Sequence, residues 1–145
     1  MRVIFFGSGD FGVPALRWLA NSRHAVAAVV TQPDRPAGRG KRLQPTPVAE
    51  RAAREGFAII PCDNVNDPAV IERLSAFDAD VGVVIDFGQK IGPAARSLFP
   101  SQCLCAHSSL LPRFRGAAPI ARAILAGEQK TGVTVFRLID RIDAG

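Results

Sequence analysis

Two cysteines and a histidine alternate along one short apolar segment of the chain. Cys103, Cys105 and His107 stand two residues apart, so their side chains share one face if the segment is a β-strand. Thiolate and imidazole groups bind metal ions, but the sequence offers no evident fourth ligand, and we predict no metal site. A Cys105–His107 nucleophile pair is the alternative, although side chains two apart on a strand point in parallel and are poorly placed to hydrogen-bond each other.

An apolar loop follows His107. It contains Leu110, Leu111 and Pro112, whereas loops are usually polar. An apolar surface beside a polar group suits a flat aromatic ligand. Asp143 is a candidate to supply a carboxylate to the same place.

A glycine-rich turn lies near the start of the chain. Residues Gly7–Gly12 match the pattern G-x-G-x-x-G between a predicted strand and a predicted helix, as in dinucleotide-binding proteins. In those proteins the turn brings backbone N–H groups to a phosphate at a helix N-terminus. Two features argue against this function: Thr31 and Gln32 end the second predicted strand with no acid for a ribose, and Asp10 is negative. A dinucleotide-dependent oxidoreductase and a tight structural turn are the two alternatives.

A basic segment follows the second predicted strand. Residues Gln32–Pro47 are predicted to form a long loop without secondary structure. The segment holds +3 of the chain's net charge of +5, from Arg35, Arg39, Lys41 and Arg42 against Asp34 alone. Cations separated by glycine and proline can follow a phosphate backbone. We therefore predict contact with nucleic acid, with a merely solvated loop as the alternative.

Short apolar runs alternate with amphipathic segments along the whole chain. Strands are predicted at Val3–Phe6, Ala25–Val30, Ala58–Ile60, Val81–Ile85, Gln102–Ala106 and Gly132–Leu138. Helices are predicted at Phe11–Ala20, Pro47–Glu55, Pro68–Ala76, Lys90–Phe99 and Ala117–Ala126. This alternation predicts an α/β, Rossmann-like, mostly parallel sheet with helices on both faces. Ligands of such sheets bind at the carboxyl ends of the strands, where residues 7–12, 86–88 and 107–116 are expected to lie.

Length and composition favour one globular domain. The chain has 145 residues, of which 48% are hydrophobic and 21% charged, which excludes wholesale disorder, collagen and coiled coil. No apolar run approaches the roughly 18 residues of a membrane span, so no membrane association is expected. The first residues do not form a signal peptide, because the apolar stretch Val3–Phe6 is too short. An odd number of cysteines without such a peptide favours reduced thiols in the cytoplasm.

The segment from His107 to Pro119 resembles the signature of the folate-dependent formyltransferases. Its residues are His-Ser-Ser-Leu-Leu-Pro followed by Arg-Phe-Arg-Gly-Ala-Ala-Pro. The segment Gln32–Lys41 is similar to the tRNA-contacting loop of the methionyl-tRNA formyltransferases. This resemblance covers essentially the whole chain. It implies a formyltransferase fold in which residues 1–145 are an incomplete N-terminal catalytic domain and a C-terminal tRNA-binding domain is absent.

The resemblance also implies a reaction. The amino group of initiator methionyl-tRNA attacks the formyl carbon of 10-formyltetrahydrofolate, an Asn and a His hold the tetrahedral oxyanion, and an Asp moves the proton through water. His107 and Asp143 occupy the His and Asp positions. The implied folate-binding residues are Ser109, Leu110, Leu111, Pro112, Asp86, Phe87 and Gly88. The implied tRNA-binding residues are Arg35, Arg39, Lys41 and Arg42. The implied partners are a reduced folate and the tRNA, with no obligate protein partner.

The sequence departs from the family pattern at three positions. Cys105 stands at the Asn position, and a thiol is a weak donor that lacks an amide N–H. Loss of one oxyanion donor typically costs a factor of ~10²–10³ in rate. Asp86 replaces a small apolar residue, and Arg141 replaces a glycine. An inactive truncated remnant that binds folate or tRNA without transferring a formyl group is therefore a further alternative.

Overall fold

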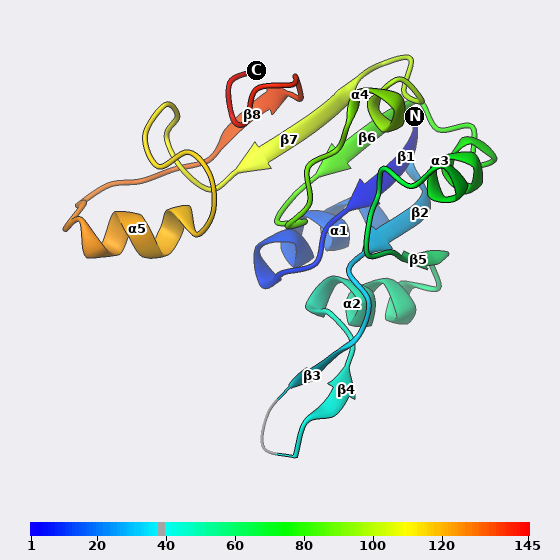
Figure 1. The fold of residues 1–145 in the computed structure, drawn as a ribbon, viewed down its shortest axis with the longest axis horizontal. Helices are drawn as coiled ribbons and strands as arrows, with labels where there is room; N and C mark the ends of the chain where they lie inside the picture. Colours follow the sequence, from blue (N-terminus) through cyan, green and yellow to red (C-terminus); the bar gives the residue numbers. More distant parts are fainter. Residues whose placement is uncertain (38–39) are drawn as a thin grey trace.

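The computed structural model describes residues 1–37 and 40–145. Over these residues the chain forms a central six-stranded sheet in the order β5-β2-β1-β6-β7-β8 (Figure 1). The strands are β1 (Arg2–Phe6), β2 (Ala25–Thr31), β5 (Ile59–Pro61), β6 (Val81–Val84), β7 (Cys103–His107) and β8 (Thr134–Arg137). All pair in parallel except β8, which runs antiparallel to β7. The predicted Rossmann-like, mostly parallel fold is confirmed, and each strand boundary lies within two residues of its prediction.

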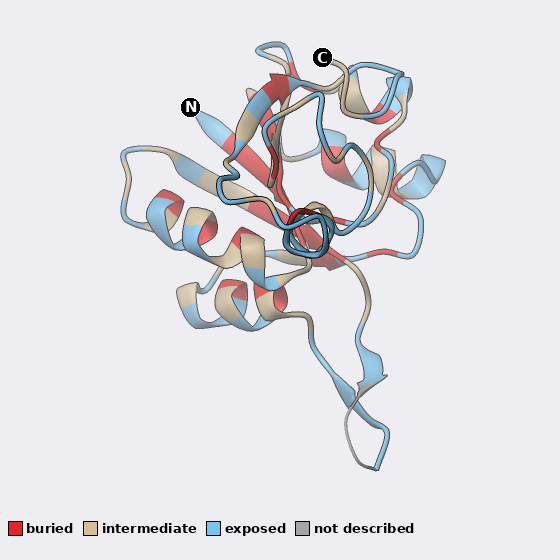
Figure 2. Ribbon diagram, turned by 90° about the vertical axis from the view of Figure 1, so that its left-hand side faces the viewer, coloured by how far each residue is buried: buried red, intermediate tan, exposed pale blue. Residues whose placement is uncertain are grey.

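Helices cover both faces of the sheet. The described helices are a 3-10 turn (Asp10–Gly12), α1 (Val13–Ala20), α2 (Pro47–Glu55), α3 (Pro68–Ser75), α4 (Pro93–Arg96) and α5 (Pro119–Leu125). Alternate residues of β1 point to opposite faces, so Phe5 packs with α1 and α2, while Phe6 packs with α3 and α4. Figure 2 shows that the buried residues concentrate on the central strands and on the inner faces of these helices.

The basic segment differs from its prediction as a structureless loop. It contains a two-stranded antiparallel hairpin, β3 (Arg35–Ala37) and β4 (Arg42–Gln44), which projects from the domain beyond α2 (Figure 1). Gly40 and Lys41 have positive φ angles of 99° and 46°, which reverse the chain and bring the flanking residues into pairing distance. A proline within β3 is tolerated because both strands of an isolated hairpin are edge strands.

Two helices are shorter than predicted because each begins at a proline. The segment Lys90–Phe99 is helical only over Pro93–Arg96, and Ala117–Ala126 only over Pro119–Leu125. Proline has no backbone N–H and clashes with a preceding turn, so it fits only the first turn of a helix. Ala118, with a φ of 52°, lies outside the right-handed helical region. Among the described residues, no helix is long and apolar enough to cross a membrane.

Candidate active site

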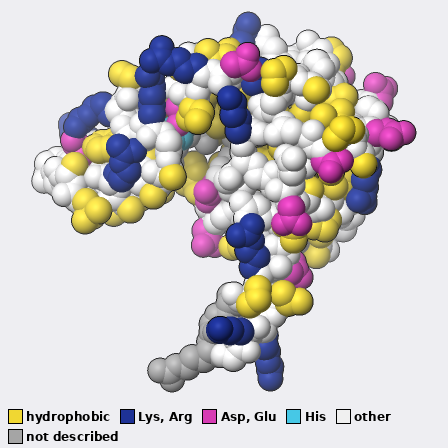
Figure 3. Space-filling model, viewed as in Figure 1, with side chains coloured by type: hydrophobic (Ala, Val, Ile, Leu, Met, Phe, Trp, Pro, Cys, Tyr) yellow, Lys and Arg dark blue, Asp and Glu magenta, His cyan; other side chains and the backbone are white. Residues whose placement is uncertain are grey.

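A cavity of about 420 Å³ opens at the carboxyl ends of β6 and β7. Four segments form most of its wall: 86–91 after β6, 105–108 at the end of β7, 116–119 before α5, and 138–143 after β8 except Asp140. Phe11 and Val84 complete the wall. Figure 3 shows the molecule hollowed between the lobe that carries α5 and the body of the sheet. The cavity thus lies at the edge where ligands of parallel α/β sheets bind.

His107 ends β7 and lines this cavity. Its Nε2 lies 3.0 Å from the carbonyl oxygen of Phe114. Because a carbonyl only accepts, Nε2 carries the hydrogen of this bond. Nδ1 faces Asp143, and the distance from Nδ1 to Oδ2 is 3.7 Å. This distance exceeds that of a hydrogen bond, so Nδ1 is the ring nitrogen left to meet a ligand.

Asp143 is held beside the ring by a backbone group. Its Oδ2 accepts a hydrogen bond of 2.7 Å from the N–H of Gly116. The side chains of His107 and Asp143 are only 10% and 12% exposed, so their interaction is weakly screened by water. Asp143 has a φ of 48°, in the left-handed region that Asp enters more readily than most non-glycine residues.

Phe114 anchors the loop that supplies the carbonyl to His107. Its φ of 56° is also left-handed. The guanidinium carbons of Arg113 and Arg122 lie 5.2 and 5.7 Å from the centre of its ring, within the range of a cation–π interaction. These contacts fix the loop, and the loop in turn fixes the orientation of the imidazole.

Cys105 lines the cavity two residues before His107. Burial, and secondarily the negative charge of Asp143, raise the pKa of its thiol to about 12. The thiol is therefore protonated at neutral pH, whereas nucleophilic attack and metal binding both require the thiolate. Cys103 packs in the core instead, where burial raises its pKa to about 12 as well. Across residues 1–37 and 40–145, no cluster of three or more His, Cys, Asp or Glu side chains is suited to a metal ion.

We expect Cys105 to react slowly with alkylating reagents. With a pKa of about 12 instead of 9.0, its thiolate fraction at mildly alkaline pH is about 10³-fold below that of a free cysteine. Iodoacetamide labelling of the folded chain, followed by mass spectrometry, should therefore be about 10²–10³-fold slower than in the urea-unfolded chain. Equal labelling rates in the folded and unfolded chain would contradict a protonated, buried thiol.

Asp86, Phe87 and Gly88 all line the cavity, on the wall that follows β6. Phe87 is buried, and its ring meets that of Phe6 edge-on at 5.6 Å. Gly88 has a φ of 79° and lies against the side chain of Gln32. The sequence-based placement of a ligand contact at this strand end therefore coincides with the cavity.

The glycine-rich turn packs against the same wall. The N–H groups of Ser8 and Gly9 both donate to the carbonyl of Asp86, at 3.0 and 3.1 Å. A Cβ on Gly9 would lie 1.9 Å from Oδ2 of Asp86, and one on Gly7 would lie 2.8 Å from the carbonyl of Ile85. The donors that a dinucleotide phosphate requires are thus used within the protein. The glycines serve the close packing of a tight turn.

The four residues from Ser109 to Pro112 do not line the cavity. Ser109 is fully buried, and its hydroxyl donates to the carbonyl of Arg113 at 2.7 Å. The N–H of Leu111 donates to the hydroxyl of Thr134 in β8 at 3.0 Å. Leu110 is 51% exposed. The contact of Ser109, Leu110, Leu111 and Pro112 with folate stays a prediction.

Three of the four predicted tRNA-binding cations lie on the hairpin, away from the cavity wall. Arg35, Lys41 and Arg42 are exposed, and Figure 3 shows cations gathered on this projection. Arg39 lies outside the described residues. Their contact with nucleic acid also stays a prediction.

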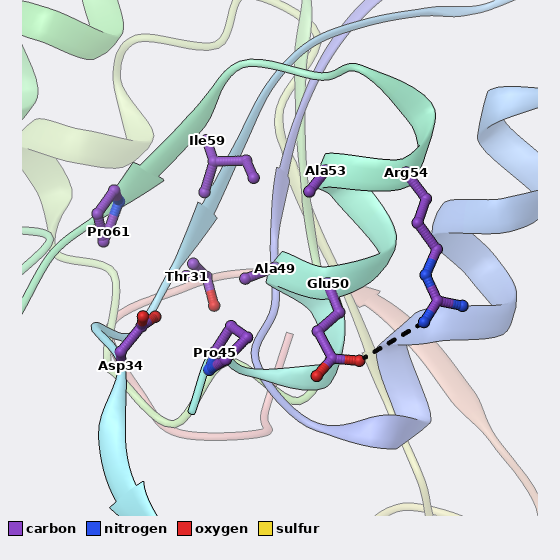
Figure 4. Close-up of a pocket in the computed structure, with 9 residues that line it drawn as sticks. All are labelled: Thr31, Asp34, Pro45, Ala49, Glu50, Ala53, Arg54, Ile59 and Pro61. Carbon is purple, nitrogen blue, oxygen red and sulfur yellow. Dashed lines mark ion pairs between the residues drawn. The ribbon is translucent and has the colours of Figure 1, made fainter. Parts of the chain in front are cut away.

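A second cavity, of about 440 Å³, lies between α2, β5 and the base of the hairpin. Figure 4 shows small and apolar side chains along its wall, with the Glu50 carboxylate 3.9 Å from the Arg54 guanidinium at its margin. None of the residues predicted to act in catalysis or folate binding lines it.

Sequence reasoning missed the backbone groups that hold the site. The carbonyl of Phe114 and the N–H of Gly116 position His107 and Asp143, yet backbone groups leave no mark on residue type. The signal that the sequence offered was the glycine at position 116, whose φ of 86° lies in the region that favours glycine.

A Rossmann-like sheet with a histidine and an aspartate in a cavity at its carboxyl edge has the architecture of an α/β enzyme domain. Residues 1–145 match the family model described as formyl transferase. The chain therefore belongs to the formyl transferase family, as its resemblance implied.

Relatives of known name agree with this assignment. The chain is 47% identical over 145 residues to the methionyl-tRNA formyltransferase of Methylobacillus flagellatus and 46% identical to that of Methylococcus capsulatus. Each match covers 100% of the chain and 47% of the relative. The chain thus spans about half the length of the curated relatives it matches.

Solved structures share the fold. A glycinamide ribonucleotide transformylase from Geobacillus kaustophilus is 29% identical, with a TM-score of 0.73 over 99% of this chain and 77% of that chain. A phosphoribosylglycinamide formyltransferase from Bacillus halodurans is 24% identical, with a TM-score of 0.75 over 100% of this chain and 75% of that chain.

Proposed function

We propose that this chain supplies the catalytic part of an enzyme that transfers a formyl group from 10-formyltetrahydrofolate to the amino group of initiator methionyl-tRNA. The names of the relatives support the choice of substrates. The observation that carries the proposal is the pair formed by Nδ1 of His107 and Oδ2 of Asp143, 3.7 Å apart in the cavity at the carboxyl edge of the sheet.

In the proposed reaction the amine nitrogen attacks the formyl carbon. A C–N bond forms, and the carbonyl electron pair moves to the formyl oxygen. The protonated ring of His107 donates from Nδ1 to this oxyanion, because Nε2 is engaged by the Phe114 carbonyl. Asp143 accepts the proton of the attacking amine through water. When the intermediate collapses, the bond from the formyl carbon to N10 breaks, and N10 takes up a proton as tetrahydrofolate leaves.

We place the pterin of the folate against Asp86, Phe87 and Gly88, where the cavity wall is partly apolar. Leu110 and Pro112 are exposed outside the cavity. In this proposal they meet, with the half-buried Leu111, only a part of the folate that extends beyond the cavity. Ser109 is fully buried, so it acts by holding this loop through its hydrogen bond to Arg113.

A calorimetric titration tests the folate site. The chain should bind 5-formyltetrahydrofolate, a stable relative of the cosubstrate, and should not bind NAD. Ala117→Trp fills the proposed cavity and should weaken folate binding by at least about tenfold. Ala53→Trp fills the second cavity, of similar volume, and should leave folate binding unchanged. Binding of NAD alone, or loss of folate binding in Ala53→Trp instead, would overturn the proposed site.

The exposed hairpin supports tRNA binding. Changing Arg35, Lys41 and Arg42 to Gln should reduce the slope of log affinity against log salt by about 2–3, at roughly 0.7–0.9 per phosphate contact. Filter binding of tRNA at several salt concentrations measures the slope. A matched control removes the same charge from exposed arginines elsewhere, namely Arg17, Arg23 and Arg73. Equal slopes for the two triple variants would show that the hairpin acts only through net charge.

A second candidate function is folate or tRNA binding without formyl transfer. The observation that favours it is Cys105, whose protonated thiol stands in the cavity where the resemblance implies an amide donor. A rate measurement on the Cys105→Asn variant separates the two functions.

A further inference from the structure

Arg96, at the end of α4, joins two walls of the cavity. Its Nη1 donates to the carbonyl of Ile91 at 3.0 Å, and its Nη2 donates to Oδ1 of Asp140 at 2.5 Å. Ile91 lines one wall, and Asp140 lies within the segment 138–143, whose other residues line the facing wall. We call this pair of contacts the Arg96 bridge. The Arg96 side chain is only 15% exposed, whereas that of Asp140 is 74% exposed, so the contact is anchored on the Arg96 side and meets solvent on the Asp140 side.

The segment after β8 has few other attachments. The N–H of Leu138 donates to the carbonyl of Cys103 at 2.8 Å, but in the described part of the chain no backbone–backbone hydrogen bond ties residues 139–145 to other elements. Ile139 and Ile142 are 44% and 60% exposed, so apolar burial contributes little. The side-chain hydrogen bonds that hold the segment are the Arg96–Asp140 contact and the Asp143–Gly116 contact.

The geometry of the Arg96 bridge requires a guanidinium. Its two acceptors belong to different segments, and a planar fork with several N–H groups reaches both at once, whereas a lysine ammonium is a single point of charge. The hydrogen bond and charge of Arg96 lower the pKa of Asp140, so this carboxyl group is ionised at neutral pH. Lys90 also lies close enough to favour the ionised form.

We propose that Arg96 is a positioning residue for the active site. By joining Ile91 to Asp140, it holds the segment that ends in Asp143, and so fixes the distance between Asp143 and His107. Its effect on folate binding rests on the proposed function, whereas its effect on the position of Asp143 does not.

Amide hydrogen exchange on the chain tests the position of Asp143. The N–H of Gly116 donates to Asp143, so its exchange rate reports whether Asp143 is in place. In Arg96→Ala and in Asp140→Asn this rate should rise by about two- to fivefold, the effect of one partly exposed charged pair. Arg96→Lys should not restore the slow exchange. The double variant should exchange no faster than the faster single variant, because both changes break one contact.

A matched control separates positioning from general stability. Arg51 is also partly buried and pairs with Glu55 on α2, far along the chain from the cavity wall. Arg51→Ala should lower the thermal midpoint without raising the Gly116 exchange rate. If Arg96→Ala and Arg96→Lys likewise lower the midpoint and leave Gly116 unchanged, Arg96 only stabilises the fold and the proposal is wrong.

Titration with 5-formyltetrahydrofolate completes the test. Arg96→Ala should weaken folate binding by about two- to fivefold, in step with the faster Gly116 exchange. Faster exchange together with unchanged folate binding would refute a role of the bridge in the site while leaving the folate site intact. If the unaltered chain binds no folate but Gly116 still exchanges faster in Arg96→Ala, the positioning of Asp143 is supported and the proposed function is wrong.

Discussion

Replacing His107 by Ala is expected to slow formyl transfer by about 10²–10³-fold, the contribution of one oxyanion donor. The variant loses the donor that Nδ1 offers to the developing oxyanion. The assay uses a hybrid protein in which residues 1–145 are joined to the C-terminal half of the Methylobacillus flagellatus relative, with 10-formyltetrahydrofolate and methionyl-tRNA as substrates. The loss should appear in kcat, because the interaction forms in the transition state.

The matched control for this prediction is His24→Ala. His24 is the second histidine of the chain and lies near Trp18, with ring centres 6.3 Å apart, away from the cavity. His24→Ala should leave kcat unchanged. An unchanged kcat in His107→Ala would remove His107 from the catalytic machinery.

The second prediction with a large expected effect is a gain in the rate of formyl transfer. Replacing Cys105 by Asn in the hybrid protein is expected to raise the rate of formyl transfer by up to ~10²–10³-fold, the contribution of one oxyanion donor. The amide side chain offers N–H groups, whereas a thiol is a weak donor. Cys105 already lines the cavity beside His107, so the new amide would stand next to the reacting carbonyl.

Two further variants sharpen this prediction. Cys105→Ser keeps the size of the side chain and supplies an O–H donor, so its rate should lie between those of the cysteine and asparagine proteins. His107→Ala combined with Cys105→Asn should lose the gain, because both donors serve one oxyanion. A lower rate in Cys105→Asn would show that the thiol has a role of its own, as nucleophile or ligand.

Local sequence patterns predicted the sheet well, because each parallel strand is a short apolar run between turn residues. The same patterns placed His107 correctly, since the strand that carries it ends where the carboxyl edge must lie. Asp143 was predicted from the resemblance and as a candidate carboxylate for this edge. Nothing in its neighbourhood indicates the 2.7 Å hydrogen bond with Gly116 that holds it.

The hairpin β3–β4 and the Arg96 bridge show what local patterns leave out. The hairpin lacks the apolar alternation that marks a strand, because both of its faces meet solvent (Figure 2). Arg96 and Asp140 are 44 residues apart, and a pair formed only when α4 packs beside the end of β8 has no local signature. Ser109 to Pro112 belong to the signature motif, yet they do not line the cavity. A sequence motif does not determine which side of a loop faces a ligand.

The most direct test of the account is the formylation of methionyl-tRNA by the hybrid protein carrying Cys105→Asn, measured in a single turnover with 10-formyltetrahydrofolate. The account predicts formylmethionyl-tRNA as product, its loss when Ala117→Trp fills the cavity of about 420 Å³, and its persistence when Ala53→Trp fills the other cavity. Formylation that proceeds equally well with Ala117→Trp, or no formylation by a hybrid that binds folate, would contradict formyl transfer at this site.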